Sequence, residues 1–198
     1  MTASRILAAG LIALTIGAVS PAKADDEILG CPDGLQSYPQ EQVKEQVGVV
    51  RDTGQDPFLR MLALEELLCA STQGVRMFAI RAALESQDET LRARAFLAAV
   101  MQRANLVVEF DRAEGLKKQT YDAINARGGA IAFEIRKRDY AEKTLTIYNG
   151  KIDVSGVVLS ISQRGSKGAF ELQPDGALKG LFYIDKVEEG APATIKLY

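Results

Sequence analysis

The 198-residue chain contains no histidine and no tryptophan, and it has only two cysteines. Without histidine, the Ser-His-Asp and Cys-His catalytic arrangements are excluded, and so are zinc sites that depend on imidazole ligands. No glycine-rich loop stands between a strand pattern and a helix pattern, which phosphate binding by such a loop requires. The sequence therefore predicts no catalytic residue, no bound metal ion and no cofactor.

Residues 1–24 have the pattern of a secretory signal peptide. Arg5 supplies the positive start, residues 6–19 are apolar, and Ala22-Lys23-Ala24 is a small-x-small cleavage site. We expect cleavage after Ala24 and a periplasmic or secreted protein. No later stretch is long and apolar enough to span a membrane, so the mature chain is expected to lack a transmembrane segment. An uncleaved anchor is the alternative, for which the apolar stretch is short.

The expected mature chain is acidic. Removing Arg5 and Lys23 leaves 22 basic residues against 26 acidic ones, a net charge of −4. This balance provides no electrostatic basis for binding nucleic acid. The remaining 174 residues suit one compact domain or two small ones.

The two cysteines, Cys31 and Cys69, are expected to form a disulfide, because an oxidising compartment maintains such bonds. The bond would hold the N-terminal segment against the end of a predicted helix. A reactive thiol is the alternative, but the chain has no histidine to activate it.

A sequence repeat with a 32-residue period predicts the helical part of the chain. Asp56, Leu59, Arg60 and Ala63 recur as Asp88, Leu91, Arg92 and Ala95. Each aspartate suits a helix N-cap, and Pro57 suits the first helical position. Three helices are expected over residues 56–103, preceded by one that begins near Pro39 and ends near Asp52.

The apolar spacing predicts which faces of these helices are buried. In the first helix of the repeat, the expected apolar stripe contains Leu59, Leu62, Ala63, Leu67 and Cys69. The helix over residues 73–86 is apolar on two faces, so we expect it in the middle of the helical domain. Phe78 is expected to be buried, and Arg76 is expected to contribute little to stability. For Arg60 and Arg92, hydrogen bonds between helices are one interpretation, and ligand binding is the other.

The segment ALESQDETLRARAFLAAV resembles the unit of HEAT-like helical repeats, in which an acidic cap leads into an arginine and then into small residues. The resemblance covers about two units, residues 56–103. It implies stacked helices with a surface for a partner chain. Solenoids usually need about three units, so something else is expected to cover the ends of the stack.

At Gly128 the pattern changes from helical to alternating, which places a boundary between a helical domain, residues 25–127, and a β domain, residues 128–198. Six strands are expected, with hairpins at Asn149-Gly150 and Pro174-Asp175-Gly176 and a bulge at Gly156. The segment YNGKIDVSGVVLSIS is similar to the opening strand of small OB-like modules in exported bacterial proteins. The predicted fold is α+β, a helical bundle followed by an antiparallel sandwich or barrel.

Two classes of function fit these features. The first is a non-catalytic interaction or scaffold module that binds another envelope protein, through the helices or through a loop or edge strand of the β domain. The second is a hydrolase that uses carboxylates on a cell-envelope polymer, with Asp111 and Glu114 as a candidate pair. Ser166 and Lys167 are expected in a solvated turn. The lack of tryptophan disfavours binding to sugars, and we prefer the interaction module.

Overall fold

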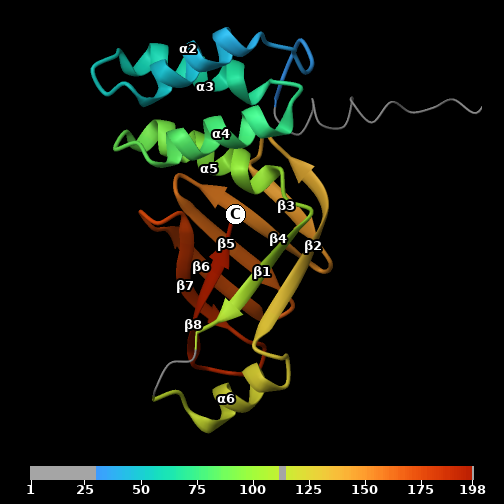
Figure 1. The fold of residues 1–198 in the computed structure, drawn as a ribbon. Helices are drawn as coiled ribbons and strands as arrows, with labels where there is room; N and C mark the ends of the chain where they lie inside the picture. Colours follow the sequence, from blue (N-terminus) through green and yellow to red (C-terminus); the bar gives the residue numbers. More distant parts are fainter. Residues whose placement is uncertain (1–29, 112–114, 198) are drawn as a thin grey trace, which may run out of the picture.

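The computed structural model describes residues 30–111 and 115–197 (Figure 1). The predicted signal peptide and Glu114 lie outside these residues. Within them, four helices are followed by an eight-stranded antiparallel barrel, so the α+β class is confirmed. The four helices are α2 (Gln40–Arg51), α3 (Pro57–Leu68), α4 (Gln73–Leu84) and α5 (Glu89–Met101). In the part of the chain described, no helix is both long and apolar enough to cross a membrane.

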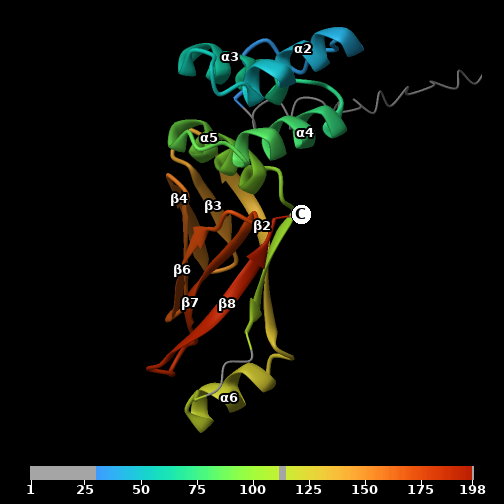
Figure 2. The same ribbon diagram turned by 60° about the vertical axis from the view of Figure 1, so that its left-hand side comes forward.

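The four helices form two stacked layers, with α2 and α3 outermost and α4 and α5 next to the barrel (Figures 1 and 2). The predicted N-caps are confirmed. The Asp56 carboxylate accepts from the backbone N–H of Phe58 at 2.8 Å, and the Asp88 carboxylate accepts from that of Thr90 at 2.9 Å. The 32-residue period therefore marks the starts of α3 and α5, whose free N–H groups the aspartates satisfy.

The predicted burial of α3 is wrong for two of its leucines, because Leu59 and Leu62 are each 48% exposed. The buried face of this helix consists of Arg60, Ala63, Leu64, Leu67 and Leu68. Arg60 turns inward because its guanidinium donates to the Val50 carbonyl at the end of α2, at 3.1 and 3.2 Å. A charged side chain therefore holds the position that an apolar pattern would give to leucine.

The prediction for the centre of α4 is also wrong. Phe78 is 47% exposed, with the Arg51 guanidinium 5.0 Å from its ring centroid, while Arg76 is buried. Arg76 donates to the Ala70 carbonyl at 2.6 Å, just beyond the end of α3. The buried face of α4 carries small side chains and Ile80, which let the neighbouring helices approach closely.

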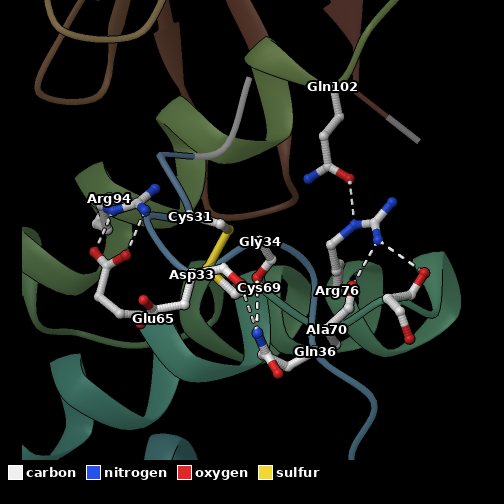
Figure 3. The surroundings of a disulfide bond; sticks show 11 residues. Cys31, Asp33, Gly34, Gln36, Glu65, Cys69, Ala70, Arg76, Arg94 and Gln102 are labelled. Atoms are coloured by element: carbon white, nitrogen blue, oxygen red, sulfur yellow. Dashed lines mark hydrogen bonds and ion pairs between the residues drawn. A yellow bond between two sulfur atoms is a disulfide. The ribbon is translucent and has the colours of Figure 1, made fainter. Parts of the chain in front are cut away.

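The predicted disulfide between Cys31 and Cys69 is confirmed (Figure 3). The segment after Cys31 also lies along the end of α3. Gln36 pairs with Ala70 in a parallel bridge, in which the Gln36 N–H donates to the Cys69 carbonyl at 2.7 Å. The N-terminal segment is therefore attached to the helical stack by a covalent bond and by backbone hydrogen bonds.

The barrel is closed, and each strand pairs with its neighbours in the chain. The strands are β1 (Asn105–Phe110), β2 (Ala130–Asp139), β3 (Thr144–Ile147), β4 (Gly150–Ser155), β5 (Val158–Gln163), β6 (Ser166–Leu172), β7 (Ala177–Tyr183) and β8 (Gly190–Lys196). Closure comes from antiparallel pairing of β1 with β8. The barrel therefore begins at Asn105 and includes residues on both sides of Gly128. Closure also removes the edge strand that a partner chain was expected to extend.

The predicted hairpins are present, but two of the turns differ in detail. At Gly156 (φ 57) the chain makes a two-residue turn from β4 to β5, and the bulge predicted there is wrong. Glycine suits the first position of such a turn, where φ is positive. The Asn149-Gly150 hairpin turns at Tyr148 and Asn149, and Gly150 already pairs with Ile147 in the ladder. Pro174-Asp175-Gly176 connects β6 to β7 as predicted.

Apolar side chains fill the interior of the barrel. Phe182 is at the centre of an aromatic cluster, with ring centroids at 6.0 Å from Phe110 and from Phe133 and at 6.5 Å from Phe170. Helix α6 (Lys118–Asn125) lies at the end of the barrel away from the helical stack (Figures 1 and 2). The core is continuous from the helices into the barrel, so a functional site has to be sought on the surface.

Candidate functional site

Three acidic side chains among the described residues have partners other than a second carboxylate. Glu65 forms an ion pair with Arg94, and Glu66 accepts a hydrogen bond from Gln42 Nε2 at 2.9 Å. Asp111 is exposed and accepts from Thr194 Oγ1 at 3.2 Å. Its predicted partner, Glu114, is outside the described residues. No group of three or more potential metal ligands occurs among the residues that the structure describes.

Ser166 and Lys167 were predicted in a turn, but they are the first two residues of β6, and the turn is formed by Arg164 and Gly165. The Ser166 hydroxyl accepts from the backbone N–H of Asp185 at 2.9 Å. The Lys167 ammonium lies 5.6 Å from the centroid of the Tyr183 ring. The two side chains have different partners, and they do not form a nucleophile and base.

A groove of about 710 Å³ crosses the outer face of β5, β6 and β7. Strand register arranges the outward side chains of these three strands in three rows. The first row is Val158, Glu171 and Lys179; the middle row is Ser160, Ala169 and Leu181; the third is Ser162, Lys167 and Tyr183. The groove follows the middle row because Ser160 and Ala169 have small side chains. The rows on either side contain the larger side chains of Glu171, Lys179, Lys167 and Tyr183.

The floor of the groove also depends on close approach of two backbones. A Cβ atom at Gly180 of β7 would lie 1.9 Å from the carbonyl oxygen of Ala169 on β6. Only glycine fits such an approach without a shift of the strand. Beside it, Leu181 is 46% exposed and extends the apolar surface of the middle row toward Pro192 of β8.

The rim of the groove carries charges of both signs. Lys179 lies beside Glu171 in the strand register and forms an ion pair with Asp175 at 3.8 Å. At the opposite side, Lys167 lies over the Tyr183 ring. The groove therefore combines an apolar floor with a polar, charged margin.

A second hollow of about 640 Å³ adjoins the groove and shares Lys167 and Tyr183 with it. The segment after β7, including Val187 and Glu188, forms its other side. Tyr183 is held against the backbone, because a Cβ at Gly190 would lie 2.8 Å from its ring. The tyrosine ring therefore packs against the Gly190 backbone between the two hollows.

No residue of this groove was predicted from the sequence as a binding residue. One signal was present: Val158, Ala169 and Leu181 are apolar or small at positions where alternation places polar side chains outside. The strand pattern identified these positions only as strand residues. Their assembly into one row required the register of three strands.

No protein-family model matches this chain, and no characterised protein or solved structure matches it either. The chemistry of the groove is therefore inferred from its own side chains. Its floor can bury apolar groups of a partner, and Lys167, Lys179 and Glu171 can orient charged groups of the same partner. Such an arrangement suits recognition of a binding partner.

Proposed function

We propose that this protein is an exported, non-catalytic interaction module, and that the groove on β5, β6 and β7 binds another protein of the cell envelope. The observation that carries the proposal is the exposed apolar row of Ala169 and Leu181 inside a charged rim. Protein interfaces combine an apolar centre with a polar margin, and tyrosine is enriched in them. The Cys31–Cys69 disulfide supports export.

The closed barrel limits how the partner binds. All eight strands have two paired neighbours, so the partner cannot add a strand to the sheet. It has to place apolar side chains on Ala169 and Leu181, with Tyr183 beside them. Opposite charges on the partner would meet Lys167, Lys179 and Glu171.

The signs of the rim charges favour a protein over an anionic lipid surface. A lipid surface of one charge would be recognised by a basic cluster. Here Glu171 lies between the two lysines in sequence and lines the same groove. Mixed charges instead provide orientation and selectivity toward a partner that also carries both signs.

We also propose that the two layers of helices are HEAT-like units. The matching caps at Asp56 and Asp88 and the stacking of the α2–α3 pair on the α4–α5 pair support this interpretation. These units would provide a second binding surface, on the helical stack, at a fixed distance from the groove. The protein would then act as a scaffold.

The groove is tested by site-specific photocrosslinking from position 169 in cells, followed by purification of the crosslinked partner and measurement of its affinity. Leu181→Glu should weaken this purified complex at least tenfold, because a carboxylate would be buried against apolar groups. Leu62→Glu on the helical stack is the matched control and should leave it unchanged. Equal affinity of the Leu181→Glu variant, or turnover of an envelope polymer that Asp111→Asn abolishes, would count against the proposal.

A further inference from the structure

The outer face of α3 is apolar and exposed at the end of the molecule away from the barrel. Phe58 is 67% exposed, and Leu59 and Leu62 are each 48% exposed. Residues three and four apart are neighbours on a helix surface, so both Phe58 and Leu59 adjoin Leu62. We call these three side chains the α3 patch. The helical hairpin formed by α2 and α3 thus carries a continuous apolar surface outside its core.

The internal repeat indicates what kind of surface this is. Leu59 corresponds to Leu91 through the 32-residue spacing of the Asp56 and Asp88 caps. Leu91 is fully buried in the stack, whereas Leu59 is half exposed at the open end. Terminal units of stacked helical proteins ordinarily carry polar outer faces. The α3 patch therefore exposes to solvent Leu59, whose counterpart Leu91 in the second repeat is buried in the core.

The helical hairpin of α2 and α3, which carries the patch, is acidic. Residues 40–68 contain six acidic and three basic side chains; the acidic ones are Glu41, Glu45, Asp52, Asp56, Glu65 and Glu66. The three basic residues are already engaged, and so are two of the acidic ones, Glu41 with Lys44 and Glu65 with Arg94. Lys44 pairs with Glu41 at 3.2 Å, Arg51 lies over the Phe78 ring, and Arg60 is buried.

This charge distribution distinguishes between possible occupants. A second copy of the chain would bring the same acidic margin against the first, and like charges oppose association. A helix with leucines on one face and lysines on the other would bury the patch and neutralise its margin. We propose that the α3 patch docks a basic amphipathic helix of a partner protein, at a surface separate from the groove on the barrel.

The probe is a fluorescein-labelled 18-residue peptide with leucines along one helical face and lysines along the other. Titration with the disulfide-intact mature protein should give saturable one-to-one binding by fluorescence anisotropy. Leu59→Ser combined with Leu62→Ser should weaken binding at least tenfold, because the apolar contact is lost. Added salt should also weaken it, since exposed charges are screened within about 10 Å at 0.1 M ionic strength.

Val107→Ser is the control, because Val107 is an exposed apolar side chain of the barrel outside both proposed surfaces, and this variant should bind the peptide as the unchanged protein does. A peptide with glutamates in place of the lysines should fail to bind. The proposal is overturned if the double serine variant binds the lysine peptide with unchanged affinity. It is also overturned if sedimentation velocity shows a dimer of the mature protein that the double variant dissociates, because the patch would then bind a second copy.

Discussion

The helical stack buries two arginines, Arg60 and Arg76, whereas the buried side chains of the barrel strands are apolar. The difference follows from the backbone. Helices end with unpaired carbonyl groups, and both arginines donate to carbonyls at or just beyond such ends, those of Val50 and Ala70. A closed barrel pairs its strands with one another and leaves no edge. Charged donors are therefore needed in the core of the stack and not in that of the barrel.

The largest expected effect compares one substitution in the two regions. Phe182→Ala should lower the free energy of unfolding by about 3–5 kcal/mol, because it empties the centre of the aromatic cluster. Phe78→Ala should cost less than about 1 kcal/mol, since it removes an exposed ring under Arg51. Urea unfolding measures both. Equal losses would show that the two phenylalanines share one environment.

Removal of the disulfide should destabilise the helical stack and leave the barrel unaffected. The loop-entropy model gives about 4 kcal/mol for joining cysteines 38 residues apart. Cys31→Ser with Cys69→Ser should therefore increase hydrogen exchange in α2, α3 and α4, while the barrel amides keep their protection. Uniform loss of protection in both regions would mean that the stack and the barrel unfold as one unit.

The two repeat arginines give a matched pair within the stack. Arg60→Met should destabilise by about 1–3 kcal/mol, because it leaves the buried Val50 carbonyl without its donor. Arg92→Met, at the equivalent position in the second unit, should stay within about 0.5 kcal/mol, as is usual for side chains near the surface. Chemical denaturation of the two variants tests this difference. Similar losses would refute a special role for Arg60.

The smallest effect concerns the end of the barrel at α6. Glu189 accepts hydrogen bonds from the Thr120 hydroxyl and from the Lys117 N–H, and these lower the pKa of its carboxyl below the ordinary 4.5. A lowered pKa in the folded state means that this stabilisation is present above pH 4.5 and is lost as the pH falls through the folded-state pKa. The protection factors of the α6 amides, which correct for the pH dependence of intrinsic exchange, should therefore fall in acid.

Glu189→Gln supplies the control for this pH dependence. The amide cannot titrate, so exchange in α6 should lose the acid-dependent component, and amides of β5 and β6 should behave alike in both proteins. An identical acid response in the glutamine variant would assign the effect to other groups.

Particular residues show how far sequence reasoning reached. The caps at Asp56 and Asp88, the disulfide and the Pro174-Asp175-Gly176 hairpin were predicted, because each depends on residues with strong local or pairwise preferences. Phe78 was placed in the core because its spacing is apolar, yet two arginines occupy interior positions instead. No periodicity identifies an arginine whose partner is the end of another helix.

The sequence by itself determined the helix starts, most of the strands and the positions of the turns, since capping, alternation and positive φ act over a few residues. Only the tertiary structure decided which helix faces are buried, that β1 closes the barrel with β8, and that Ser160, Ala169 and Leu181 form one row. These features depend on contacts between segments far apart in the chain. Their geometry is set by register and packing, which the order of residues along one strand or helix does not specify.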